Sequence, residues 1–281
     1  MPRWDTLTME RSEALRRHVE RARQWSGQPV FVDSHAHLDR YSEVEVGALV
    51  GRARAAGVRL LLAVSTDLTS SLRTLALCRR WPEALPAIGV HPLAVETATE
   101  ADLARLEALA RSFERVVAIG EVGLDVEASV PLSRQRQAFR RQALLARSLG
   151  LPMVLHVRGA VDALLEELRD LDWPSRRGVV HYFTGDEAQA ERLVRAGLLL
   201  SVGKPVTRPE QTALRRAVAL VPLDCLLLET DSYPLPGRLT EPRDVRLVAE
   251  AVAEIKGCSL DEVATATTRT FLDLVTPRPT R

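Results

Sequence analysis

From about residue 30 onward, short apolar runs alternate along the chain with longer stretches in which apolar and charged residues recur at helical spacing. The apolar runs are rich in β-branched residues, which favours strands. We predict strands near residue 31 and at 58–65, 84–91, 115–123, 152–157, 178–183, 197–203 and 225–230. We predict helices over 43–57, 68–81, 101–113, 133–150, 160–171, 186–197, 209–221 and 242–257.

Eight strands that alternate with eight helices indicate an α/β fold, a single (β/α)8 TIM barrel, which we place at residues 29–276. A doubly wound open sheet is the alternative, but it needs fewer strands, and the chain lacks a glycine-rich phosphate-binding turn.

Two further helices are predicted outside the eight repeats. One covers 9–25, within an N-terminal extension of residues 1–28, and is expected to pack outside the barrel or to be loosely attached. The other covers 259–275, where Ser259 and Glu262 fit a capping box. Residues 277–281 are expected to form a flexible tail.

The composition is that of a soluble globular protein, with 46% hydrophobic and 27% charged residues in a chain of 281. The net charge of +1 gives no global field for nucleic acid, so an anionic substrate must be held by a local patch. No apolar run reaches membrane-spanning length, and the N-terminus lacks the apolar core of a signal peptide. The three cysteines are scattered, without zinc-binding spacing, and are expected to be reduced. We therefore expect a cytoplasmic protein with no membrane partner; its oligomeric state is open, with a monomer slightly favoured.

Ionisable residues gather at the ends of the predicted strands. Five of the six histidines lie there, together with two carboxylates: His35, His37, His91, His156, His181, Glu121 and Asp231. In a barrel, the carboxyl ends of the strands meet on one face, which is where active sites lie. Each residue alone could be a hydrogen-bonded core histidine, a salt-bridge partner or a helix cap, but their shared position favours one common site.

Four imidazoles and two carboxylates are too many for one catalytic zinc, which typically has three protein ligands. They suit two divalent ions that share a bridging carboxylate and activate a water molecule. The expected assignment is His35, His37 and Asp231 for one ion, His156 and His181 for the other, and Glu121 for both. Asp231 is expected to orient or deprotonate the attacking water, so Asp231 and Glu121 are the catalytic candidates. The histidine-rich ligand set favours zinc or manganese.

Other residues on the same face are candidates for contact with substrate. With the metal ligands already assigned, His91 is expected to donate to a substrate phosphate or, alternatively, to hold its own loop. Arg158 lies two residues beyond His156, Lys204 follows the seventh strand, and Thr184 could offer its hydroxyl group. The charges of Arg158 and Lys204 could instead be solvated loop charges, and Tyr182 could pack internally or stack on a base.

Six segments together resemble the TatD family of metal-dependent hydrolases, within the amidohydrolase-like superfamily. They are "DSHAHLD", "IGVHP", "IGEVGLD", "LPMVLHVRGA", "HYFTG" and "LLETDS", which span residues 33–231. The resemblance implies a TIM barrel, the dimetal roles given above, and deoxyribonuclease activity, commonly as a 3′ to 5′ exonuclease with magnesium. The chain departs from the family at Tyr182, where cysteine is usual, and in "ETDSYPLP", so the substrate-side loops differ.

Three functions follow from these residues. The first is a deoxyribonuclease that acts on DNA ends and prefers single strands. The alternative is a dimetal hydrolase of a carbon ester, amide or lactone, including deacylation of aminoacyl-tRNA, and the low aromatic content of 4% keeps it open. The third, a binding module with a vestigial site, is disfavoured because all six expected ligands are present.

Overall fold

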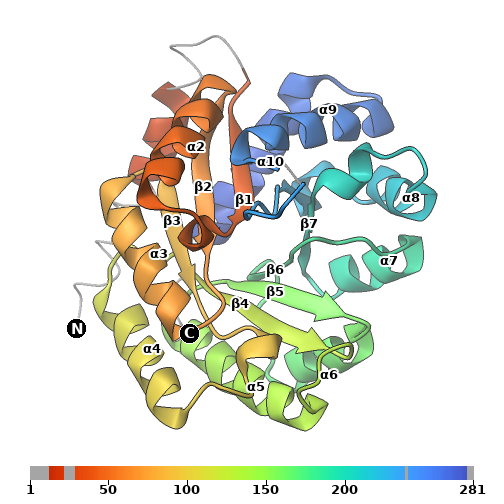
Figure 1. Cartoon of the computed structure of the whole chain (residues 1–281). Coiled ribbons are helices and arrows are strands. Elements are labelled where there is room, and N and C mark those ends of the chain that lie inside the picture. Colours follow the sequence, from red (N-terminus) through yellow and green to blue (C-terminus); the bar gives the residue numbers. More distant parts are fainter. Residues whose placement is uncertain (1–12, 22–28, 238–239, 277–281) are drawn as a thin grey trace.

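The computed structural model describes residues 13–21, 29–237 and 240–276, and it confirms the predicted barrel (Figure 1). Eight strands follow one another in sequence order, and each is parallel to the next. The strands are β1 (Phe31–Ala36), β2 (Val58–Val64), β3 (Ala84–Ile88), β4 (Ala118–Asp125), β5 (Met153–Arg158), β6 (Gly178–Val180), β7 (Leu199–Val202) and β8 (Leu226–Leu228).

Helices follow the strands and surround the barrel, as Figure 1 shows. The α-helices are α2 (Glu43–Ala55), α3 (Leu68–Arg80), α4 (Glu100–Ser112), α5 (Leu132–Ser148), α6 (Val161–Asp170), α7 (Glu187–Arg195), α8 (Thr212–Leu220), α9 (Val245–Lys256) and α10 (Leu260–Val275). Short 3-10 helices are η1 (Leu38–Arg40), η2 (Pro92–Ala94), η3 (Lys204–Thr207), η4 (Leu223–Cys225) and η5 (Pro242–Asp244). None of the helices in the described ranges is both long and apolar enough to span a membrane.

Two apolar layers hold the barrel together, and they follow the alternation of side chains along each strand. Leu60 and Leu62 of β2 point into the barrel interior, whereas Leu61 packs in the layer that includes Val46 and Val50 of α2. Burial on both faces explains why the strands appear in the sequence as nearly continuous apolar runs.

Helical residues 13–21 and α10 cover the end of the barrel where the strands begin. Val19 is buried in the same interior cluster as Phe271, and the Thr268 hydroxyl donates to the carbonyl oxygen of Val30. Arg16 forms an ion pair with Asp273 at 2.6 Å. The rest of the predicted helix over 9–25 and the predicted tail at 277–281 lie outside the described residues.

Three strands end earlier than the apolar pattern predicts, and this difference shapes the opposite end of the barrel. Strands β3, β6 and β8 end at Ile88, Val180 and Leu228. The predicted strands continue past each of these residues, but the regular pairing of the strands ends there. Residues 89–91, 181–183 and 229–230 therefore belong to loops, and the loops carry several of the candidate site residues.

The barrel closes between its first and last strands through backbone bonds at the candidate site. The N–H of Asp231 donates to the carbonyl oxygen of His35 at 2.9 Å, and the N–H of His37 donates to Ser232 at 3.0 Å. The seam of the barrel therefore brings His35, His37 and Asp231 together, although Asp231 lies far from the two histidines in the sequence.

Candidate metal centre and active site

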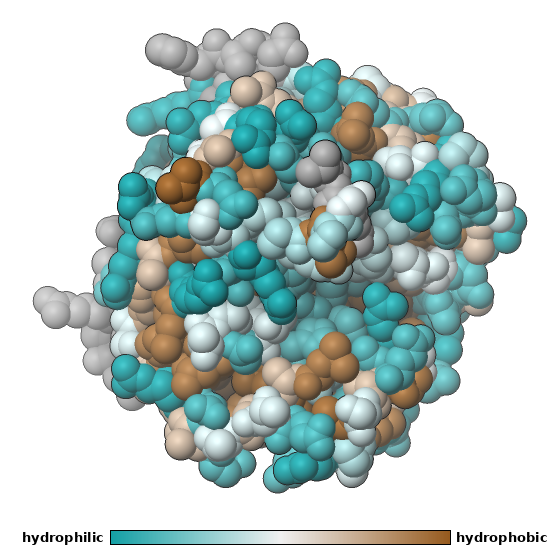
Figure 2. Space-filling model, in the orientation of Figure 1, coloured by the Kyte–Doolittle hydropathy of each residue, from teal (hydrophilic) through white to brown (hydrophobic). Residues whose placement is uncertain are grey.

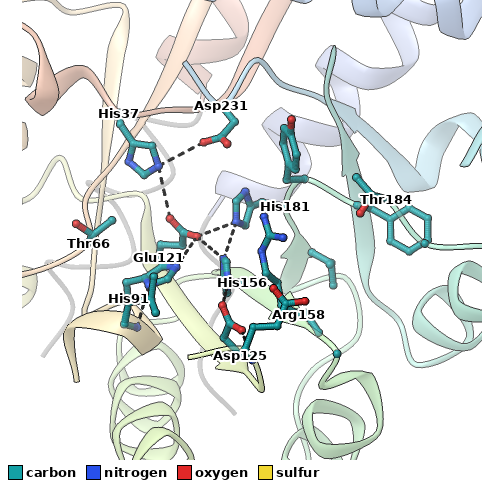
Figure 3. Close-up of a pocket in the computed structure, with 18 of the residues that line it drawn as sticks. His37, Thr66, His91, Glu121, Asp125, His156, Arg158, His181, Thr184 and Asp231 are labelled. Atoms are coloured by element: carbon teal, nitrogen blue, oxygen red, sulfur yellow. Dashed lines mark hydrogen bonds and ion pairs between the residues drawn. The ribbon is translucent and has the colours of Figure 1, made fainter. Parts of the chain in front are cut away.

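Glu121 lies at the centre of the cluster of site residues, and Figure 3 shows it between His37 on one side and His156 and His181 on the other. Each of its carboxylate oxygens faces a different pair of histidines. Its Oε1 lies 2.7 Å from Nε2 of His181 and 2.9 Å from Nδ1 of His156. Its Oε2 lies 3.5 Å from Nε2 of His35 and 3.6 Å from Nε2 of His37. A carboxylate shared by two cations needs each oxygen to face a separate group of ligands, and Glu121 meets this requirement.

The first histidine pair comes from β1 and the turn that follows it. The Nε2 atoms of His35 and His37 lie 3.3 Å apart, and Oδ1 of Asp231 lies 3.4 Å from Nε2 of His37. The Nδ1–H of His37 donates to the carbonyl oxygen of Val64 at 2.9 Å, so the neutral ring carries its lone pair on Nε2. These three residues form a group close enough to hold a metal ion.

The second pair comes from β5 and from the residue that follows β6. Nε2–H of His156 donates to Oδ2 of the buried Asp125 at 2.9 Å, and Nδ1 of the same ring faces Oε1 of Glu121 at 2.9 Å. Nδ1 of His181 lies 3.5 Å from Oε1 of Glu229. A carboxylate behind each histidine is the usual support of a metal-binding imidazole.

The chemistry of this donor set fits divalent cations. Imidazole lone pairs and carboxylate oxygens converge at distances of 2.7 to 3.6 Å, and most of the residues that carry them are buried. Without a cation or added protons, lone pairs placed this close repel one another. Nδ1 of His35 and Nδ1 of His181 are buried without a hydrogen-bond partner in the described part of the chain.

His91 lies beside this cluster but presents an N–H donor to it, not a lone pair. Its Nε2 is 3.3 Å from Oε1 of Glu121, and its Nδ1 accepts from the N–H of Leu93 at 3.0 Å. Because Nδ1 accepts, the neutral ring carries its proton on Nε2. His91, Glu121 and His156 are close enough to form a metal-binding group, but this tautomer makes His91 a hydrogen-bond donor.

Electrostatics keep the two carboxylates of the site ionised. Burial raises the pKa of Glu121, but the charge of His181 and hydrogen bonds from His156 and His181 outweigh it, so the pKa lies well below its ordinary value. Burial also raises the pKa of Asp231, but the hydrogen bond with His37 and the charges of nearby histidines outweigh it, so this pKa is lowered as well.

The histidines whose pKa is shifted divide into two groups by the direction of the shift. Burial lowers the pKa of His35 and the pKa of His91, so both rings favour the neutral form. Burial also acts against the charged forms of His37 and His181, but nearby carboxylates outweigh it and raise both pKa values.

A cavity of about 930 Å³ opens over the cluster, and it receives most of the predicted substrate contacts. Arg158, Tyr182 and Thr184 line it together with His91. The ring of Tyr182 also packs on Gly203, where a Cβ atom would lie 3.2 Å from it, so Tyr182 combines packing with exposure to the cavity. Around the cavity, the face in Figure 2 is mainly hydrophilic, with scattered apolar side chains.

Lys204 is not among the described residues that line the cavity, and its contact with substrate stays a prediction. It begins η3, and its Nζ lies 3.5 Å from Oγ1 of Thr240 and 4.0 Å from Oδ2 of Asp244. The side chain therefore lies near the segment before α9.

Several residues at the site were not identified from the sequence, among them Asp125, Glu229, Arg40 and Tyr233. Glu229 stands two positions before Asp231, a spacing that places two residues on the same side of a strand and could have indicated it. Asp125 could have been found only with the knowledge that β4 continues to residue 125. Arg40, which lines the cavity, follows "HLD" without a distinguishing pattern.

Comparisons with known proteins agree with this geometry. The profile of the family described as TatD related DNase matches residues 32–276. The uncharacterized metal-dependent hydrolase YjjV of Escherichia coli K12 is 36% identical over 245 residues, which are 84% of this chain and 94% of that protein. A crystal structure of YjjV, a TatD homologue, matches with a TM-score of 0.81 at 35% identity and covers 87% of this chain and 97% of that one.

A 3′-5′ ssDNA/RNA exonuclease TatD of Cronobacter turicensis is 41% identical over 199 residues, which are 68% of this chain and 74% of that protein. The family profile covers the whole barrel, including every residue of the cluster around Glu121. The chain therefore belongs to the TatD family and is a metal-dependent hydrolase.

Proposed function

We propose that this hydrolase is a deoxyribonuclease that removes nucleotides from the 3′ end of DNA, preferring single strands, with two divalent metal ions. The observation that carries the proposal is the division of Glu121 between two histidine pairs, one at each carboxylate oxygen. A relative named as a 3′-5′ ssDNA/RNA exonuclease and a mouse relative named as a putative deoxyribonuclease support the choice of substrate.

The expected ligands are His35, His37 and Asp231 for one ion, His156 and His181 for the other, and Glu121 for both. When bound, two divalent ions supply Lewis acidity that polarises a phosphoryl oxygen and makes water a nucleophile at neutral pH. Imidazole nitrogen favours zinc or manganese, and magnesium is the third candidate.

The protein groups around the ions have separate tasks in this proposal. Asp231 has a lowered pKa and faces the cavity, so its carboxylate can orient an attacking water and accept its proton. Nε2–H of His91 can donate to a non-bridging phosphate oxygen. Arg158 at the rim can pair with a phosphate of the strand. Tyr182 and Tyr233 line the cavity and offer rings on which a base can stack.

The test begins with chelated protein, to which magnesium, manganese or zinc is added back. Single-stranded DNA labelled at either end is the substrate, beside duplex DNA and RNA of the same sequence, with Asp231→Asn as the inactive control. A ladder that starts from the 3′ end and disappears in Asp231→Asn is the expected result. Hydrolysis of lactones or carbon esters without cleavage of nucleic acid would overturn the nuclease assignment, and metal binding without turnover would indicate a binding module.

A further inference from the structure

Helix α5 carries two buried glutamines on the face that it turns toward the barrel. Gln135 and Gln142 are 1% and 2% exposed, and their separation of seven residues places them on the same side of the helix. Each side-chain amide binds both the N–H and the carbonyl oxygen of one residue near the metal centre. These two hydrogen bonds are the ones that a neighbouring strand would otherwise make with that residue. An amide side chain can make both because it carries an acceptor and a donor.

Gln142 holds Val90, the residue before His91. Its Oε1 accepts from the N–H of Val90 at 2.7 Å, and its Nε2 donates to the carbonyl oxygen of Val90 at 3.1 Å. The pairing of β3 with β4 ends at Ile88 and Ile119, so Val90 lies beyond the sheet ladder. The amide therefore fixes the backbone from which the His91 ring projects.

The chain leaves the ladder at this point because β4 passes close to the end of β3. A Cβ atom at Gly89 would lie 2.9 Å from the backbone of Gly120. The N–H of Glu121 then donates to the carbonyl oxygen of Ser65, at the end of β2, at 2.8 Å. The backbone around Val90 is thus displaced toward α5, where Gln142 meets it.

Gln135 holds Asp125 in the same way. Its Oε1 accepts from the N–H of Asp125 at 2.8 Å, and its Nε2 donates to the carbonyl oxygens of Asp125 at 2.9 Å and Val130 at 2.7 Å. The carboxylate of Asp125 accepts from the ring of His156. Gln135 therefore acts on a candidate metal ligand through one intermediate residue.

We propose that Gln142 and Gln135 are positioning residues with different targets. Gln142 positions His91 for contact with a phosphate, and Gln135 positions Asp125 and thereby His156 for metal binding. The His91 part rests on the proposed function. A glutamine that only stabilised the fold would affect neither phosphate nor metal affinity selectively.

The test compares Gln135→Met and Gln142→Met with Gln137→Met, which changes an exposed glutamine on the same helix. Manganese affinity of the chelated protein, affinity of the metal-loaded protein for inorganic phosphate, and the unfolding temperature are measured for each. We expect Gln135→Met to weaken metal binding by roughly tenfold or more. We expect Gln142→Met to leave metal affinity within about twofold and to weaken phosphate binding by about tenfold.

Double variants separate positioning from general loosening. If Gln142 acts through His91, then Gln142→Met has no further effect on phosphate affinity in a His91→Ala background. Gln135→Met should likewise add nothing to the loss of metal affinity caused by Asp125→Asn. Additive effects, equal effects of both methionine variants on both ligands, or a change in unfolding temperature alone would overturn the proposal.

If a methionine variant does not fold, the leucine variant takes its place, because Gln142→Leu and Gln135→Leu also remove donor and acceptor together and add no buried charge. The same pattern of effects is then expected. None of these measurements uses DNA, so a failure of the nuclease assignment is visible separately. Absence of phosphate binding by the unaltered protein would overturn the His91 part together with the proposed phosphate contact, while the Gln135 part is decided by metal affinity.

Discussion

Nε2 of His156 lies 2.9 Å from Oδ2 of Asp125, and Nδ1 of the same ring lies 2.9 Å from Glu121. An ionised carboxylate can only accept a hydrogen bond, so when a cation takes the place of a proton on the Glu121 side, Asp125 keeps the ring proton on Nε2 and Nδ1 presents its lone pair. Asp125 thus selects the tautomer in which His156 can bind a metal ion.

Asp125→Asn is therefore expected to weaken metal binding while leaving the fold intact. The asparagine oxygen can still accept from the N–H of Glu127, but its NH₂ group then faces Nε2 and favours the opposite tautomer of His156. We expect metal affinity to fall by about 10- to 100-fold, as titration of the chelated protein would measure. Glu127→Gln removes an exposed charge from the same cavity and serves as the control. Equal losses in both variants would indicate an effect of charge alone.

His91→Ala is expected to separate metal binding from catalysis. The ring presents Nε2–H toward Glu121, so its loss removes a donor and no metal ligand. We expect the bound metal per chain, measured by elemental analysis, to be unchanged while kcat/KM falls by about 100-fold. Loss of one metal equivalent would instead make His91 a ligand.

The fold could be predicted from the sequence because β1 to β8 are buried on both faces, which leaves apolar runs that helical spacing interrupts. The positions of His35, His37, Glu121 and Asp231 followed from that frame, since parallel strands in a barrel bring their carboxyl ends to one face. For His156 the same rule sufficed, because β5 continues past the histidine to residue 158.

The rest depends on contacts that a strand pattern does not contain. Lys204 was placed beside the substrate by its position after β7, and its side chain lies near Thr240 and Asp244, which are far along the chain. Gln135 and Gln142 appear in the sequence as ordinary polar residues of a helix, and their role follows only from where β3 leaves the sheet. Tertiary geometry decided each of these cases.

Arg158→Gln is expected to weaken DNA binding, and Lys204→Gln to leave it unchanged. Only Arg158 of these two lines the cavity. If Arg158 contacts a phosphate, its loss weakens binding about tenfold and lowers the salt dependence by about 0.7 in the slope of log K against log salt. Fluorescence anisotropy at several salt concentrations, with Asp231→Asn protein to prevent cleavage, measures both quantities. A lower slope of log K against log salt in Lys204→Gln would indicate that Lys204 contacts a phosphate of the DNA.

Val19→Ala is expected to destabilise the protein through the end of the barrel opposite the site. Val19 is only 8% exposed and belongs to the same apolar cluster as Phe271, so truncation loses apolar burial and leaves a cavity. We expect a loss of about 1–2 kcal/mol in the free energy of unfolding, measured with urea. His18→Ala changes an exposed neighbour and should stay within about 0.5 kcal/mol. Equal stability of both variants would mean that residues 13–21 contribute little to the barrel.

The metal-free protein is expected to lose stability as the pH rises above 6.5. The pKa values of His37 and His181 are raised above the ordinary 6.5, so the folded state binds protons there that the unfolded chain releases. Their contribution to stability is complete below pH 6.5 and disappears as the pH rises through the raised values. Asp33 acts in the same direction from a lower pH, because burial raises its pKa above the ordinary 3.8 and its contribution starts to be lost as the pH rises above that value.

The metal-loaded protein should show the opposite trend over the same range, because ions displace these protons and bind more tightly as the pH rises. Thermal unfolding of chelated and loaded protein between pH 6.5 and 9 therefore gives two curves of opposite slope. Calorimetric titration in two buffers of different ionisation enthalpy should also detect protons released on metal binding. Parallel curves, together with heats that do not depend on the buffer, would show that His37 and His181 are neutral before the metal arrives.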